Sequence, residues 1–333
     1  MKMVNLLIIR IILTLMIFYV TAFASATHDI AADGFYMIAL NSKEASFFVG
    51  IRSTFYRLSS IFGQGVLVVI AGVLESRLSN VPRAWSITLI ISAVIFAVIT
   101  LWHTFSLPRP SEDASRKIDA SSIFREFGRT FATFFQKKGV LVAMLFMLLY
   151  RLPEAFLVKM MNPFLLNDQS VGGLGLSTEA VGLVYGTAGV AALTVGGILG
   201  GMYASRKGLK KSMWIMAAAL TLPCLSFVFL SLFQPSNIWL IASCVVLDQF
   251  GYGFGFTAYM LYLIYFSEGE FKTAHYSLCT AFMALSMMIP GMLAGYMQEW
   301  LGYTGFFIIV MLCCLVTVAV TTIVKVDPEF GKK

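Results

Sequence analysis

The chain has 333 residues, of which 59% are hydrophobic and 12% are charged. A soluble domain carries roughly twice that charged fraction, so the composition excludes an ordinary soluble protein and indicates one that lies in a lipid bilayer. The net charge of +7 could also suit nucleic-acid binding, an interpretation that depends on where the basic residues lie along the chain.

Nine apolar segments are long enough to cross a bilayer, which takes roughly 20 mostly apolar residues. Because no water reaches the hydrocarbon, each segment must satisfy its own backbone hydrogen bonds as a helix. The sequence therefore predicts an all-α polytopic membrane protein with about nine transmembrane helices, at 5–27, 47–74, 85–106, 139–166, 178–204, 212–232, 238–266, 274–298 and 304–325.

The first apolar segment also has the features of a secretory signal peptide. Lys2 precedes an apolar run, and Ala22-Phe23-Ala24 fits a cleavage site. Cleavage there would leave eight helices and place the basic region 109–138 outside the cell, against the positive-inside rule. We therefore interpret the segment as a membrane helix.

Basic residues gather on one predicted side of the membrane. That side collects Lys43, Arg52, the cluster from Arg109 to Lys138, the group from Arg206 to Lys211, and the C-terminal lysines. By the positive-inside rule this side is the cytoplasm, so a cytoplasmic C-terminus is predicted. The basic residues are then explained by orientation in the bilayer, and no nucleic-acid partner is expected.

A polar linker separates three predicted helices from six. Within it, Phe124, Phe127, Phe131 and Phe134 recur at helical spacing opposite charged residues, which predicts a helix on the membrane surface, with a partner-binding helix as the alternative. The predicted organisation is a partial N-terminal bundle (1–106), a cytoplasmic linker (107–138) and a six-helix bundle (139–333). A six-plus-six transporter without its first three helices would have this count.

The segment GMYASRKGLKK, beginning at Gly201, joins the fifth and sixth predicted helices. It resembles the G-x-x-x-D-R-x-G-R-R loop of the major facilitator superfamily, with Gly201, Arg206, Gly208 and Lys210 in register. Ser205 stands where that pattern has an acidic residue, which weakens the gating salt bridge that the pattern implies. The resemblance implies the major facilitator fold, and it makes the first predicted helix equivalent to helix four of twelve.

Four further stretches resemble the AmpG-type muropeptide permeases: SATHDIAADGF (25–35), GIRSTFYRLSSIFGQG (50–65), LLYRLPEAF (148–156) and DQFGYGFGFTAYMLYL (248–263). His28, Gly34 and Phe35 depart from the usual pattern. The resemblance implies import of anhydro-muropeptides by proton symport across the bacterial inner membrane, as part of peptidoglycan recycling. Acetyl-coenzyme A transporters are similar in the same stretches, so another anionic solute or a sugar derivative is the alternative, as is a truncated fragment that does not transport.

Asp29 and Asp33 lie four residues apart, so both carboxylates project from one face of a helix. A carboxylate at membrane depth resists ionisation and can exchange a proton near neutral pH, which proton coupling requires. The alternative is a structural pair that binds Arg52 or Arg57 as a static gate, because charges inside membranes usually pair.

Several polar residues inside the predicted helices are candidates for solute binding. A guanidinium grips a carboxylate or phosphate through two parallel hydrogen bonds. Pro153 breaks the fourth predicted helix, and broken helices often carry substrate sites in transporters. Arg151 and Glu154 could instead simply satisfy each other. The candidate solute-binding residues are Tyr56, Arg57, Gln64, Tyr150, Arg151, Glu154, Asp248 and Gln249.

Small residues predict close contacts between helices rather than chemistry. Gly251, Gly253 and Gly255 follow Gln249, and three pairs of glycines lie four residues apart: Gly196 with Gly200, Gly197 with Gly201, and Gly291 with Gly295.

No enzymatic function is expected, because the sequence contains no GxGD, GxSG or HExxH element. The five cysteines show no CxxC spacing and the three histidines are scattered, so no metal site is predicted, and no cofactor is expected. The expected partners are a small-molecule solute, protons and the lipid bilayer. The oligomeric state stays open.

Overall fold

The computed structural model describes residues 2–107 and 120–331; side chains at 2–9, 120–124, 178–179 and several positions between 42 and 69 lie outside the described part. Throughout the described ranges the chain forms helices joined by turns, without a strand. The first part consists of α1 (Lys2–Ala39), α2 (Ser42–Ile61), the π-helical turn η1 (Phe62–Val66), α3 (Leu67–Leu78) and α4 (Val81–Ser106).

The linker helix α5 (Ala120–Phe135) covers the amphipathic run that the sequence predicts. The C-terminal bundle follows, with α6 (Val140–Leu149), α7 (Leu152–Leu166), η2 (Gln169–Val171), α8 (Thr178–Val181), η3 (Gly182–Gly189), α9 (Val190–Lys207), α10 (Leu209–Thr221), α11 (Cys224–Phe233), α12 (Ile238–Ser267) and α13 (Lys272–Ile323).

Within the described residues, seven helical stretches are long and apolar enough to cross a membrane. One of them, α13, contains two predicted spans, because its backbone leaves the helical conformation at Gly302 with φ +67°. The seven stretches thus cover eight of the nine predicted spans. The remaining prediction, 47–74, corresponds to α2, η1 and α3, where the helix is interrupted by a π-helical turn. The prediction of an all-α polytopic fold is confirmed.

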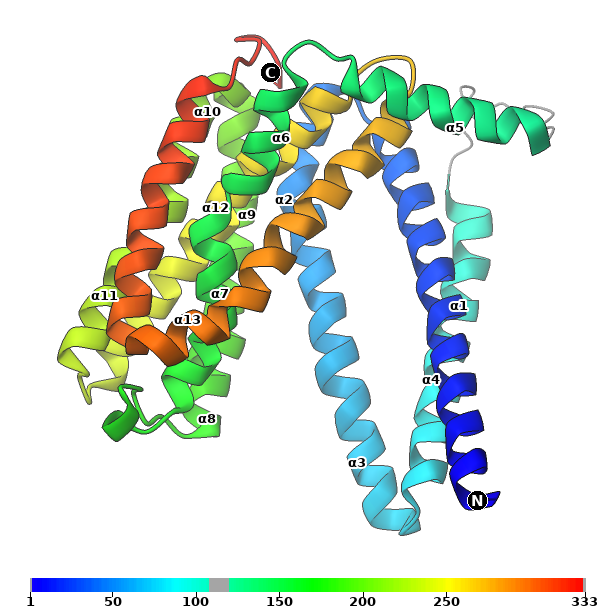
Figure 1. Cartoon of the computed structure of the whole chain (residues 1–333), viewed down its shortest axis with the longest axis vertical. Helices are drawn as coiled ribbons and strands as arrows, with labels where there is room; N and C mark the ends of the chain where they lie inside the picture. The colour runs from blue at the N-terminus through cyan, green and yellow to red at the C-terminus, as the bar shows by residue number, and fades with distance from the viewer. Residues whose placement is uncertain (1, 108–119, 332–333) are drawn as a thin grey trace.

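Figure 1 shows how the two parts of the chain are arranged. They meet near the end of the molecule that carries the C-terminus, where α5 also lies across the helix ends. Away from this end, α3, α4 and the beginning of α1 diverge from the C-terminal bundle. Contacts of α2 with α9 and of α1 with α13 join the two parts.

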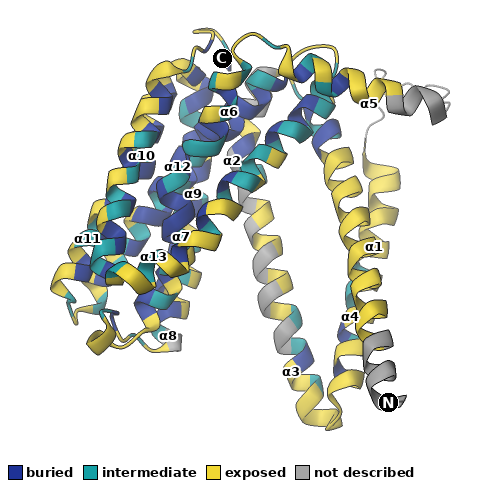
Figure 2. Ribbon diagram, in the orientation of Figure 1, coloured by how far each residue is buried: buried dark blue, intermediate teal, exposed yellow. Residues whose placement is uncertain are grey.

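The buried core belongs mainly to the C-terminal bundle, and α1 and α4 are largely exposed (Figure 2). One cluster, near the C-terminal end, includes Phe146, Tyr150 and Tyr259. A second cluster contains Phe164, Phe227 and Phe307. Apolar side chains also cover the outer surface, and Phe18, for example, is 66% exposed. Such a surface suits contact with lipid or with other apolar helices, because lipid tails are as apolar as these side chains.

Glycines let α12 lie close to a helix on each side. A Cβ on Gly253 would collide with the carbonyl oxygen of Leu193 in α9, and one on Gly255 would lie 2.6 Å from the carbonyl oxygen of Met216 in α10. Gly196 and Gly200 of α9 face α12 in the same manner. The predicted packing role is therefore observed at these positions, whereas a Cβ on Gly295 would have nothing within 4 Å among the described residues.

Candidate functional site

The backbone is interrupted between α6 and α7, at Tyr150 and Arg151. Pro153 lies two residues after Arg151 and has no N–H with which to continue the helical ladder. Side chains from other helices bind the carbonyl oxygens that lie beside this break. Thr317 donates to the carbonyl of Tyr150 at 2.9 Å, and Tyr259 donates to that of Met147 at 2.6 Å. The break predicted from Pro153 is thus a defined, hydrogen-bonded structure.

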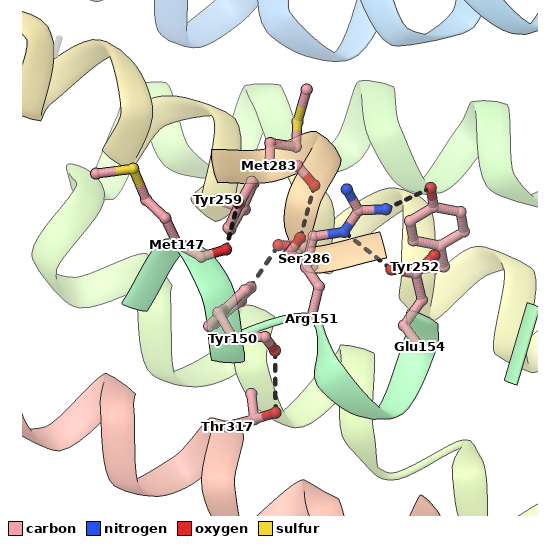
Figure 3. A network of polar contacts seen from close by, with 10 residues as sticks. Met147, Tyr150, Arg151, Glu154, Tyr252, Tyr259, Met283, Ser286 and Thr317 are labelled. Atoms are coloured by element: carbon pink, nitrogen blue, oxygen red, sulfur yellow. Dashed lines mark hydrogen bonds and ion pairs between the residues drawn. The ribbon is translucent and has the colours of Figure 1, made fainter. Parts of the chain in front are cut away.

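Arg151 lies at this break and is 4% exposed. Its Nε donates to a carboxylate oxygen of Glu154 at 2.9 Å, and another guanidinium nitrogen donates to the Tyr252 hydroxyl at 3.0 Å (Figure 3). The guanidinium carbon also lies 4.5 Å from the centre of the Phe256 ring and 5.6 Å from that of Tyr259. The cation is therefore held by one carboxylate, one hydroxyl and aromatic faces, which favour a weakly hydrated guanidinium.

Two buried carboxylates, Glu154 and Asp248, lie in the same bundle as the buried guanidinium of Arg151. Glu154 is 4% exposed, and one of its oxygens has no hydrogen-bond partner among the described residues. Asp248 is 5% exposed and accepts a hydrogen bond of 3.1 Å from the amide of Gln249. Buried carboxylates are costly unless they are paired or protonated. The two buried carboxylates therefore outnumber the one guanidinium described beside them.

A second polar cluster joins α1, α2 and α13 near the end where the two parts of the chain meet. Arg52 of α2 donates to the buried carboxylate of Asp33 in α1, and it also donates to the Tyr276 hydroxyl of α13 at 3.2 Å. The guanidinium lies 5.1 Å from the centre of the Tyr36 ring. Lys272 adds a hydrogen bond of 3.1 Å to the carbonyl of Met37. These contacts connect the N-terminal part to the C-terminal bundle through charged groups.

The structure brings together only some of the predicted site residues. Asp33 is buried, whereas Asp29, one turn earlier, is exposed. Tyr56 is 73% exposed. The side chains of Arg57 and Gln64 lie outside the described part. Asp33 contacts Arg52, one of the two arginines named in the alternative of a structural Asp29–Asp33 pair, and Arg151 contacts Glu154, as in the alternative that these two satisfy each other.

Sequence reasoning did not identify Tyr252, Phe256 and Tyr276 as members of these clusters. A helical spacing signal was present for the first two, since Asp248, Tyr252 and Phe256 recur every four residues and therefore share one face of α12. Tyr276 lies 224 residues from Arg52, and no local pattern indicates that contact.

The loop that carries the superfamily pattern lies between α9 and α10. Gly208 is buried and has φ +77° and ψ 162°, a conformation that is essentially restricted to glycine. Arg206 and Lys210 are exposed, and Gly201 is buried. Ser205, at the acidic position of the pattern, donates to the carbonyl of Met202 at 2.9 Å. The backbone conformation at position 208 therefore requires glycine. The Ser205 hydroxyl, in contrast, forms its hydrogen bond within α9.

A family model described as Major Facilitator Superfamily matches the chain in two overlapping stretches, 4–268 and 155–333. A "Putative transporter AmpG 4" of Rickettsia felis is 24% identical over 297 residues, which cover 88% of this chain and 68% of that protein. A "Putative transporter AmpG 3" of Rickettsia prowazekii is 26% identical over 302 residues, 89% of this chain and 68% of that protein. An uncharacterized protein of Haemophilus influenzae is 22% identical over 295 residues, 86% of this chain and 65% of that protein. The chain spans about two thirds of the length of these relatives.

Proposed function

Because this chain belongs to the major facilitator superfamily, we propose that it is a secondary active transporter that imports anhydro-muropeptides by symport with protons. The proposal places it in a bacterial inner membrane, with its C-terminus in the cytoplasm. Relatives named as putative AmpG transporters support the assignment as a transporter, and the substrate class is what the four AmpG-like stretches of the sequence imply. No catalytic role is proposed.

The observation that carries the proposal is the buried Arg151 at the break between α6 and α7. A peptide or sugar acid carries a carboxylate, and the planar guanidinium fork binds a carboxylate through two parallel hydrogen bonds. In the structure Glu154 accepts one hydrogen bond of 2.9 Å from the Nε of Arg151. An incoming carboxylate therefore competes with Glu154 for Arg151, while the aromatic rings of Tyr252 and Phe256 offer faces on which a sugar can lie.

This competition explains why a proton accompanies the solute. When a solute carboxylate takes Arg151, the buried Glu154 loses its cation, in the same bundle as a second buried acidic residue, Asp248. A displaced, buried carboxylate is strongly favoured to bind a proton. Glu154 and Asp248 therefore join the proton-exchanging groups of this proposal.

The Asp33–Arg52 pair acts in the proposal as a gate on the cytoplasmic side. Protonation of Asp33 removes the charge that holds Arg52, and the contacts between α1, α2 and α13 then loosen. Alternating access in transporters needs such a contact, which forms in one state and breaks in the other.

The test is uptake of labelled anhydro-muropeptide into cells that express the chain, with and without a protonophore. We expect uptake that exceeds that of cells without the chain, is abolished by the protonophore and is not competed by acetyl-coenzyme A. Competition by acetyl-coenzyme A but not by unlabelled muropeptide would assign the site to the other anionic substrate class. Uptake that ignores the protonophore would overturn the proton symport.

A further inference from the structure

A basic pocket opens at the end of the C-terminal bundle, and neither Arg151 nor the Asp33–Arg52 pair lines it. It lies where the loop between α5 and α6 meets the last turns of α12 and α13, and its volume is about 780 Å³. Its polar lining consists of Lys137, Lys138, Tyr262, Tyr265, Glu268 and Lys325. Three ammonium groups thus face one carboxylate, so the pocket attracts anions.

One of the three lysines is held in place by the protein. The Lys137 ammonium donates to the carbonyl oxygens of Phe266 at 2.6 Å and Glu268 at 2.8 Å, and so satisfies the C-terminal end of α12. Burial lowers the pKa of Lys137, although Cys279 and Glu268 oppose that shift. A bound anion would favour its charged form further.

The other two lysines are available to a ligand. Lys138 and Lys325 are both exposed, and within the described ranges neither forms an ion pair or hydrogen bond. They come from different segments, the loop before α6 and the end of α13, and they line the same pocket. Two ammonium groups on flexible stems can converge on one phosphate.

The pocket also has an apolar wall that continues onto the membrane-facing surface. Val142 of α6 and Ile323 of α13 line it. The neighbouring Leu141 and Leu145 are 68% and 37% exposed, and α6 and α13 belong to stretches that can cross a membrane. A free anion would use only the lysines, whereas an amphiphile with an anionic head would use the lysines and the apolar wall together.

We propose that this basic pocket binds an anionic phospholipid, with the phosphate at Lys138 and Lys325 and the first part of an acyl chain along Val142 and Ile323. The pocket lies at the level of the helix ends, where headgroups are located. This inference is independent of the solute and of proton coupling, because it uses no residue of either polar cluster.

The test uses the full chain purified in a neutral detergent, and native mass spectrometry measures binding of phosphatidylglycerol and of phosphatidylcholine. We expect phosphatidylglycerol to bind preferentially, and the double variant Lys138→Gln/Lys325→Gln to weaken that binding roughly 30-fold, as two lost lysine contacts imply. The matched control, Lys207→Gln/Lys211→Gln, removes two exposed lysines from the α9–α10 region and should change the affinity less than about threefold.

If both double variants lost the same phosphatidylglycerol affinity, the lipid would be attracted by the general positive charge of this end of the molecule, and the proposed site would be overturned. Inorganic phosphate that displaces phosphatidylglycerol at an affinity close to that of the lipid would overturn the lipid assignment in favour of a soluble phosphate ligand. The melting temperature without lipid is measured for every variant. If the double variant unfolds, the single variants Lys138→Gln and Lys325→Gln are compared with Lys207→Gln, and equal lipid affinity among these three would contradict the site.

Discussion

Arg151 is the residue on which both the stability of the C-terminal bundle and the proposed solute binding depend. Replacing it by methionine leaves Glu154 as a buried carboxylate without its cation, and breaking a buried ion pair in this way costs about 3–5 kcal/mol. We expect Arg151→Met to lower the free energy of unfolding by that amount, measured by denaturant titration in detergent. Lys159→Met, at an exposed position on the following helix α7, is the control and should change it by less than about 0.5 kcal/mol.

A second variant, at Glu154, shows why Arg151→Met loses stability. If the cost comes from an unpaired charge, the double variant Arg151→Met/Glu154→Gln will be more stable than Arg151→Met alone, by about 1–3 kcal/mol. A double variant that is as unstable as the single one would mean that Arg151 contributes through its aromatic contacts with Phe256 and Tyr259 instead of through its charge.

Asp33 and Asp29 are one turn apart on α1, yet their surroundings differ. Asp33 is 2% exposed and binds Arg52, whereas Asp29 is exposed. A gate that depends on this ion pair predicts that Asp33→Asn reduces protonophore-sensitive uptake at least about tenfold, and that Asp29→Asn reduces it less than about threefold. Uptake measured on matched amounts of membrane-inserted protein checks both. Equal losses in the two variants would instead indicate a shared proton site on α1.

At the scale of helices, the close contact between α9 and α12 depends on glycines, which have no side chain. A methyl group at Gly253 would meet the carbonyl oxygen of Leu193, and this atom belongs to a helix backbone and cannot turn aside. Gly253→Ala should therefore separate the two helices and destabilise the bundle by about 1–3 kcal/mol. The matched control is Gly182→Ala in η3, where a Cβ would have nothing within 4 Å. Thermal unfolding in detergent measures both, and equal melting temperatures would contradict the packing role of Gly253.

Most of the helices could be predicted from the sequence because apolar length is a strong and local signal. The break at Pro153, the turn between 298 and 304 and the amphipathic helix of the linker follow from equally local features. The π-helical turns η1 and η3 were not predicted, because they add one residue to a turn without changing the apolar pattern. The packing role predicted for Gly295 rests only on its spacing of four residues from Gly291, and this spacing does not indicate which face of a helix has a neighbour.

The candidate site was predicted in part for the same reason. Arg151 and Glu154 are three residues apart, so their pairing is visible on one helical turn. The contacts of Arg52 with Tyr276 and of Arg151 with Tyr252 join residues more than 100 positions apart, and only the packing of the two parts of the chain brings them together. Their long range is also what makes them useful for linking those parts.

At the scale of the whole molecule, the N-terminal part and the C-terminal bundle meet at one end and diverge away from it (Figure 1). The contacts that join that end include the Arg52 cluster, the hydrogen bond from Lys272 to Met37, and the close approach of Gly34 to Thr273. If this end opens during transport, a covalent link across it must stop uptake. If it is a permanent structural contact, the same link will leave uptake unchanged.

Gly34 and Thr273 offer the geometry for such a link. A Cβ on Gly34 would lie 3.8 Å from the Cβ of Thr273, close to the Cβ separation of about 3.8 Å found in disulfides. We expect Gly34→Cys/Thr273→Cys, in a background where the five native cysteines are replaced by serine or alanine, to form a disulfide under mild oxidation. Removal of the Thr273 methyl group, which would lie 2.8 Å from the new Cβ, leaves room for the sulfur atoms.

The measurement is uptake by the same vesicles before oxidation, after oxidation and after reduction, with the extent of cross-linking read from gel mobility. Oxidation should abolish uptake in proportion to the cross-linked fraction, and reduction should restore it, while the single variants Gly34→Cys and Thr273→Cys respond to neither treatment. Complete cross-linking with undiminished uptake would show that α1 and α13 stay together throughout transport, and the gate would then have to lie elsewhere. Because the outcome follows the reversible bond and not the substitutions, it separates a blocked motion from a damaged fold.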